Sequence, residues 1–415
     1  MKKTLSFLVI VFVLMFAVSC GSSSDSEPTT EPTTEPTEEP TTEPTTEPTE
    51  EPDTEEPDAE EPDSEEPDSE EPDSEEPDTE EPDTEEPTEE PIETHEIIGR
   101  YHDTWNYSHI ISRTAWLQPS EYGDSLFHIK YVDIVDDFII AQNDAEKAFF
   151  KEKWSRFDYT IKEGKIYYCQ IAFNADTKED AFAATTADRT DLTEKGCNDN
   201  PWSELIAVVE EPIDKDDEKI VAWASGYENY IVGEGVTEEW QTPEKALGKA
   251  VGDSYDVVVL GDGGSIVLTF AKPITDGVGA DFAVFENSFN DGFLELGTVE
   301  VSSDGENFVA FDHFYLGLEK IGGTGSHDAS LIWGFAGKFR QGKGTMFDLA
   351  DLKGKPEVVD GSVNLEAITH IKIIDVIGDG SQFDSIGDPI YDPYPTGAIS
   401  AGFDLDAIAV INQKE

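Results

Sequence analysis

Basic residues are scarce in this 415-residue chain, which has 27 Lys and Arg against 92 Asp and Glu and a formal net charge of −65. Residues 21–92 contain no Lys or Arg, yet they hold 33 acids and 15 of the 24 prolines. Residues 93–415 are also acidic, with 59 acids against 25 bases. A nucleic-acid partner is excluded because two polyanions repel each other, and an anionic membrane surface is equally unfavourable. Any membrane attachment must therefore be covalent.

The sequence also lacks the signatures of common enzymes. It has no Gly-x-Ser-x-Gly, no His-Glu-x-x-His and no Gly-x-x-x-x-Gly-Lys-Ser/Thr. Residues 322–328 put Ser, His and Asp side by side, but a catalytic triad is assembled from separated segments. With so many acids, a carboxylate pair at glycosidase spacing arises by chance. We therefore expect a protein that is not an enzyme, and a carbohydrate-active enzyme with a hidden acid/base pair remains the alternative.

No apolar run is long enough for a comfortable transmembrane helix. Lys2 and Lys3 precede an apolar run of about fourteen residues, which is the length of a signal-peptide core. The small residues before Cys20 resemble a bacterial lipobox, in which the Cys becomes the diacylated N-terminus. We predict a lipoprotein signal peptide over residues 1–20 with Cys20 as the lipidation site, and an ordinary secretory signal is the alternative. Gly21 favours the outer membrane or the cell surface, since the inner-membrane retention signal has Asp there.

Cysteine is rare, with three residues in the chain. Once Cys20 is assigned to the anchor, Cys169 and Cys197 remain. An even number of cysteines in an exported protein indicates a disulfide, so we predict that these two are bonded. Two cysteines without a nearby histidine would make a poor zinc site.

Residues 21–92 lack large apolar side chains over almost their whole length. They repeat Glu-Pro-Thr-Thr tetrads and then pentads of Glu-Glu-Pro-Asp followed by Thr, Ser or Ala. Without large apolar side chains they have nothing to bury and cannot form a core. Regular prolines favour polyproline II, and like charges extend the chain further. We predict a disordered acidic Pro/Thr/Glu stalk that spaces a domain from the membrane. A weak calcium-collecting tract is the alternative.

The remaining residues are enough for two domains of ordinary size. A charged run with a proline at 210–218 marks the boundary. The first domain, 93–212, mixes strand-like runs at 127–132 and 165–171 with an Ala-rich helix expected over 176–188. We predict a small α+β domain with one disulfide.

Four segments of the first domain resemble an uncharacterised domain of Gram-negative lipoproteins from myxobacteria-like lineages. They are residues 138–144, 154–159, 167–170 and 196–203. That family has no established activity, so the resemblance implies an exported location and a Cys169–Cys197 pair. Three histidines of this domain, His102, His109 and His128, could form a metal cluster, but packed or surface histidines are the simpler interpretation.

The second domain, 219–415, shows the pattern of an all-β fold. Short runs of β-branched residues and Phe alternate with Gly, Asp and Asn turns. The expected strands are 257–260, 265–270, 282–285, 298–302, 308–311, 370–376 and 407–411. This number of strands predicts a β-sandwich or jelly roll, so the fold class of the folded part is mainly β.

Five blocks of the second domain, in order, resemble a family of bacterial cell-surface proteins with a galactose-binding-like, discoidin-like β-sandwich. They are residues 260–266, 279–287, 299–308, 368–376 and 389–408. The Val-Glu-Val-Ser-Ser-Asp-Gly block also recurs in F5/8-type carbohydrate- and lipid-binding modules. The resemblance implies a surface binding module and often one structural calcium.

A set of acids on turns is a candidate calcium site, because calcium binds six to eight oxygen ligands. Asp404 and Asp406 have the spacing of one strand face, with Phe403 and Leu405 on the other. The predicted ligands are Asp281, Glu286, Asn287, Asp404 and Asp406. The alternative is that these residues only cap turns, as is common in an acidic β protein.

The loop at 377–397 is the candidate ligand-binding loop, because aromatic rings stack on sugars while carboxylates bind hydroxyl groups. Its candidate residues are Asp384, Asp388, Tyr391, Asp392 and Tyr394. A rigid solvated loop is an equal alternative. We therefore expect a lipid-anchored surface protein that displays a binding module for a glycan or other surface polymer. A structural or adhesive envelope protein that binds another protein is the further alternative.

Overall fold

The computed structural model describes residues 94–120, 123–146, 150–397 and 399–414. The predicted lipidation site at Cys20 and the predicted stalk lie outside these residues. The described residues belong to one compact unit and contain two β-rich parts, each with its own core. The chain is mainly β, as its sequence predicts.

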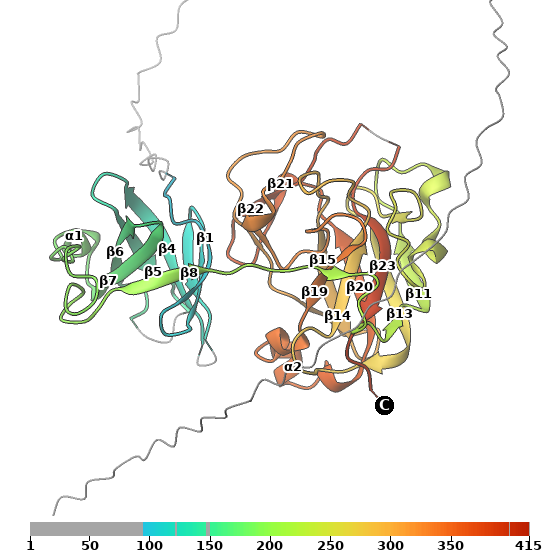
Figure 1. Ribbon diagram of the computed structural model, residues 1–415, viewed down its shortest axis with the longest axis horizontal. Coiled ribbons are helices and arrows are strands. Elements are labelled where there is room, and N and C mark those ends of the chain that lie inside the picture. The colour runs from blue at the N-terminus through green and yellow to red at the C-terminus, as the bar shows by residue number, and fades with distance from the viewer. Residues whose placement is uncertain (1–93, 121–122, 147–149, 398, 415) are drawn as a thin grey trace, which may run out of the picture. The chain divides into compact units, whose positions relative to one another are not determined.

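The first part is a closed barrel of eight strands in which every neighbouring pair is antiparallel (Figure 1). Strand order follows the sequence, and the barrel closes where β1 pairs with β8, with Tyr101 opposite Ala207. The strands are β1 (Gly99–Asp103), β2 (Ser108–Ile111), β3 (Ala115–Gln118), β4 (Ser125–Asp133), β5 (Phe138–Asn143), β6 (Trp154–Lys162), β7 (Lys165–Ala175) and β8 (Ser203–Ala207). Trp116, stacked on Phe157 at 4.3 Å between ring centroids, lies in the barrel's hydrophobic core.

The sequence predicted too much helix for this domain. The domain is a β-barrel with one short helix. Helix α1 covers only Lys178–Phe182, capped by the Thr177 side chain, instead of 176–188. The buried Arg156 side chain donates to the carbonyls of Phe182 and Ala184, and Asp158 accepts from the Ala187 N–H. These side-chain bonds take up backbone groups that a longer helix would pair internally.

The predicted disulfide is present, since Cys169 of β7 is bonded to Cys197. Cys169 is buried, and it packs with Trp202 and Ala187 in a small apolar cluster outside the barrel core. The bridge therefore ties the excursion between α1 and β8 to the barrel wall.

The second part contains two antiparallel sheets. One has the order β10-β23-β14-β19-β9, with β12 also paired to β23, and the other has the order β11-β13-β20-β15-β16. The strands of the first sheet are β9 (Ile213–Asp214), β10 (Ala222–Trp223), β12 (Val258–Val259), β14 (Phe282–Glu286), β19 (Lys343–Phe347) and β23 (Asp404–Val410). Those of the second are β11 (Gly226–Ile231), β13 (Ser265–Ile274), β15 (Gly297–Ser302), β16 (Val309–Ala310) and β20 (Ile368–Asp375).

Four more strands and a helix complete this part. Strand β17 (Phe314–Tyr315) pairs with β18 (Ile332–Trp333), and β21 (Asp379–Phe383) pairs with β22 (Pro389–Tyr391). Helix α2 covers Pro356–Val359. The small pairs lie in the connections, where surface loops carry recognition residues in many proteins.

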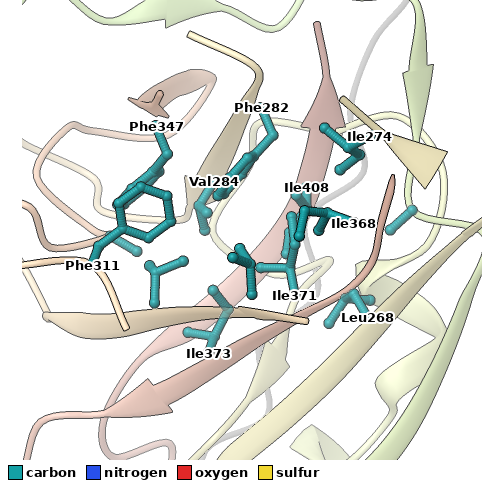
Figure 2. Packing of buried hydrophobic residues seen from close by; sticks show 14 of the residues in the cluster. Leu268, Ile274, Phe282, Val284, Phe311, Phe347, Ile368, Ile371, Ile373 and Ile408 are labelled. Carbon is teal, nitrogen blue, oxygen red and sulfur yellow. The ribbon is translucent and has the colours of Figure 1, made fainter. Parts of the chain in front are cut away.

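One hydrophobic core lies between the two sheets (Figure 2). Phe282, Val284 and Ile408 of the first sheet meet Ile371 and Ile373 of the second. Phe282 stacks on Phe347 with 5.2 Å between ring centroids. All seven strands expected in this domain are confirmed, because short apolar runs rich in β-branched residues and Phe, bounded by turn residues, mark buried strands.

Candidate functional site

A surface pocket of about 460 Å³ lies next to β17. Its lining comes from Tyr315, from Gly317 and from the loop that leads to β18. Beside Tyr315, the polar side chains of the lining are those of Glu319, Lys320, Ser326, His327 and Asp328. The size falls in the range of small-molecule sites.

His327 reaches from this pocket to Asp392, which follows β22. Its Nε2 lies 3.0 Å from Asp392 Oδ1, and both side chains are buried. Burial lowers the pKa of His327 to about 4 and raises the pKa of Asp392. Because both shifts favour the uncharged forms, the contact is a hydrogen bond that fixes the ring at the pocket wall. The other oxygen of Asp392 accepts from the Leu296 N–H at 3.0 Å.

Two tyrosines lie together at the same place. The Tyr315 and Tyr391 rings pack edge to face with 6.2 Å between centroids, and the Tyr315 ring also meets His327 at 5.8 Å. The Lys320 ammonium lies 5.9 Å from the centroid of the Tyr391 ring. The Tyr315 ring lines the pocket and the Tyr391 ring packs beside it, so aromatic surface lies next to donors and acceptors, which is the combination that binds a polar ring-shaped ligand.

The loop residues predicted from sequence divide into two groups. Tyr391 and Asp392 lie beside the pocket, whereas Asp384 and Asp388 are buried inside the loop. Asp384 accepts from the N–H groups of Tyr315, Ile386 and Asp388, so it holds the loop against β17.

Asp388 and Tyr394 are the remaining two predicted loop residues. One oxygen of Asp388 accepts from Thr114, and the other is buried without a hydrogen-bond partner. Tyr394 is half-buried and precedes the cis peptide bond to Pro395.

Sequence analysis missed Tyr315, Lys320 and His327 as pocket residues. Residues 322–328 were weighed only as a triad of neighbours, but the acidic partner of His327 lies 65 positions away. Clustered glycines beside polar side chains were the only signal that this loop carries a site.

Three of the five predicted metal ligands lie together. Glu286 ends β14, Asn287 follows it, and Asp404 begins the neighbouring strand β23. Asn287 donates from Nδ2 to Asp404 Oδ2 at 2.9 Å, and the charge of Asp404 helps burial to raise the pKa of Glu286.

Glu295 is a further buried acid of this domain, and the sequence did not single it out. It lies two residues before β15 and is 5% exposed. Burial raises its pKa well above the usual value, and the charge of Asp404 is the next largest cause. A single glutamate in a loop of an acidic chain gives no sequence signal.

Asp406 and Asp281 lie elsewhere. Asp406 accepts from the N–H groups of Val251 and Gly252, which holds a loop against β23. Asp281 precedes the opposite end of β14, where it accepts from the N–H groups of Gly277 and Leu349.

Asp281 instead groups with two other acids. Ligand oxygens of Asp276, Asp281 and Asp348 lie within 4.8 Å of one another. The Lys353 ammonium lies 2.7 Å from Asp276, and Asp348 accepts from the Ala350 N–H. The Lys353 ammonium partly neutralises the three acids, and the bond to Asp348 stabilises the turn. A bound ion is therefore not needed to explain this group.

No known protein family matches this chain, and no curated protein matches it. Within the described residues, no helix is long and apolar enough to cross a membrane.

Proposed function

We propose that the chain is a lipid-anchored cell-surface protein that displays a non-catalytic carbohydrate-binding module. The two antiparallel sheets around one core support a β-sandwich of the jelly-roll, galactose-binding-like kind for the second domain. The Cys20 lipobox supports an anchor in the outer membrane or cell surface. The acidic stalk between them would hold the module away from that membrane.

The observation that carries the binding function is the pocket beside Tyr315. Its walls offer donors and acceptors from Lys320, Ser326 and Asp328, and the Tyr315–Tyr391 pair adds aromatic surface. A sugar presents hydroxyl groups at its edge and C–H groups on its faces, so it can use both kinds of contact. Asp384 and the His327–Asp392 bond hold the walls in place before any ligand arrives, which reduces the entropy lost on binding.

The test is glycan binding by the full chain in detergent, first on a glycan array and then by calorimetry with the best ligand. We expect Tyr391→Ala and Lys320→Ala to weaken binding by about tenfold or more, since aromatic and charged contacts dominate such sites. Tyr255→Ala is the matched control, because Tyr255 is 74% exposed and belongs neither to the pocket lining nor to the aromatic pairs beside it. Binding that is equal in all variants, or absent from the array, would refute the proposal.

A carbohydrate-active enzyme is the second candidate, and the His327–Asp392 bond is the observation that favours it. A carboxylate that orients a histidine is a common part of general acid–base catalysis. The same bound glycan distinguishes the candidates, because an enzyme releases shortened product over time whereas a binding module returns the ligand intact. Loss of product release in His327→Ala with binding retained would establish the enzyme.

A further inference from the structure

A second pocket of about 460 Å³ lies on the barrel. Its walls come from the β4–β5 hairpin, from β6 and from the excursion between α1 and β8. Arg156 and Arg189 both line it, although the whole chain has only five arginines and a net charge of −65. Arginine is the preferred partner of carboxylates, because its planar guanidinium matches their geometry. Two arginines in one pocket of so acidic a chain indicate an anionic ligand group if one of them is free.

Arg156 is not free for a ligand, because it builds the pocket wall. Its Nε donates to Asp158 Oδ1 at 2.7 Å, and both side chains are buried. Its Nη2 donates to the Thr186 hydroxyl, while its Nη1 donates to two carbonyls at and just after the end of α1. Asp158 also accepts from the Ala187 N–H, so the pair ties the excursion to β6. The charge of Arg156 is thus neutralised within the protein.

Arg189 is held by the backbone and keeps one nitrogen unused. Its Nε donates to the Tyr159 carbonyl at 3.2 Å, and its Nη2 donates to the carbonyls of Asp136 and Asp137 at 2.6 Å and 2.9 Å. Within the residues that the structure describes, Nη1 makes no hydrogen bond and the half-buried side chain forms no ion pair. The three bonds to carbonyls fix the guanidinium, so little freedom is lost when a ligand binds to Nη1.

The rest of the lining combines an aromatic face with hydrogen-bond acceptors. The Tyr131 and Phe182 rings pack edge to face with 4.9 Å between their centroids, and Tyr131 is 37% exposed. Asp133 is fixed in the β4–β5 turn, because it accepts from the Asp136 N–H at 2.9 Å. Both of these acids are at least partly exposed, so solvent screens their repulsion of an anion. The pocket thus offers one free guanidinium nitrogen, one ring face and two carboxylates.

We propose that this pocket binds a sugar that carries a carboxylate, a uronate unit of a surface polysaccharide. Arg189 Nη1 donates to the sugar carboxylate, and the Tyr131 ring covers one face of the sugar. Asp133 and Asp136 accept from its hydroxyl groups. A neutral sugar leaves Arg189 without a partner, and an acid without hydroxyl groups leaves the two carboxylates without one. Charges beyond the Debye length of about 8 Å are screened at physiological salt, so contact with Arg189 outweighs the net charge of the chain. The pocket shares no lining residue with the one beside Tyr315, so the proposal does not depend on that site.

The test is calorimetry on the full chain in detergent, with trisaccharides of galacturonate and of glucuronate and with the matching neutral trisaccharides. The parent chain carries Lys320→Ala and Tyr391→Ala, so that the pocket beside Tyr315 does not contribute. EGTA is present throughout, because calcium would bridge the acidic residues 21–92 to a uronate. We expect at least one uronate trisaccharide to bind with a Kd of about 1 mM or tighter, and its neutral counterpart to bind at least about tenfold more weakly.

Arg189→Gln in this parent should weaken uronate binding by about tenfold or more, because it removes the partner of the carboxylate. Arg340→Gln is the matched control, since it removes the same charge from a 48% exposed side chain outside the pocket, and it should bind as the parent does. Tyr131→Ala should also weaken binding, and it decides the outcome if Arg189→Gln lowers the melting temperature of the barrel. The proposal is overturned if neither uronate binds at about 10 mM, if the neutral counterpart binds equally well, or if Arg189→Gln or Tyr131→Ala leaves the affinity unchanged.

Discussion

His109, one of two buried histidines in the first part, connects the stability of the barrel to pH. The Trp116 indole donates to His109 Nδ1 at 3.1 Å, so this nitrogen carries no proton. His109 Nε2 faces Asp103 at 3.5 Å and the Tyr168 hydroxyl at 3.4 Å. Burial lowers the pKa of His109 to about 4, although Asp103 opposes the shift. Protonation of His109 would place the added proton on Nδ1, which would break the bond from Trp116.

We predict that this histidine destabilises the barrel in acid. Between pH 6.5 and about 4 the unfolded chain binds a proton that the folded chain does not, so the free energy of unfolding falls as the pH falls. A shift of this size amounts to about 3 kcal/mol at most for one group. His109→Asn keeps an acceptor near Trp116 but cannot be protonated, so it should lose less stability from pH 7 to 4.5. Denaturant titrations followed by tryptophan fluorescence measure the difference, and parallel pH profiles would contradict the prediction.

At the scale of the elements, the disulfide lies within the first part, so its removal should change the stability of that part alone. We predict that Cys169→Ser with Cys197→Ser lowers the free energy of unfolding of the barrel by about 3 kcal/mol, because the bridge closes a loop of 28 positions in the unfolded chain. The second domain should be unaffected. Thermal melts with and without reductant check this, using the variant under reductant as the control. A loss of stability in both parts would show that they unfold together.

The strands and helices also show how much of the fold the sequence could predict. The strands of the second domain were found because short apolar runs bounded by turn residues are a local signal, as in β14 and β20. Closure of the barrel depends on pairing β1 with β8, about a hundred positions apart, for which the sequence has no local signal. The helix was overestimated because the long-range bonds of Arg156 and Asp158 end it early.

The candidate sites show the same contrast between local signals, which the sequence contains, and long-range contacts, which it does not show. Glu286, Asn287 and Asp404 could be grouped because they lie at the ends of recognisable strands, whereas Glu295 and His327 lie in loops. Asp406 illustrates the limit of periodicity, since it has the predicted spacing from Asp404 but binds the backbone of residues 251 and 252 instead. Spacing along one strand predicts a shared face, but partners on other segments decide which oxygens stay free for a ligand.

For the whole molecule, the lipid anchor that we propose would have to hold two folded parts at a membrane that their charge would repel. With 59 acids against 25 bases in residues 93–415, electrostatic adsorption to anionic lipid is unfavourable, so the proposed membrane attachment would depend on acyl chains alone. We therefore predict that Cys20→Ser releases the protein from the membrane fraction completely, without changing its fold.

Expression in a Gram-negative host with a labelled fatty acid measures this prediction. The wild-type chain should carry the label and sediment with the outer membrane, and Cys20→Ser should be unlabelled. Cys169→Ser with Cys197→Ser is the control that changes cysteines but keeps the lipobox, and it should still be labelled and sediment. Because several acyl chains at about 0.8 kcal/mol per buried methylene are needed for durable attachment, partial acylation should give partial release. Membrane retention of an unlabelled Cys20→Ser chain would show that another segment holds the protein there.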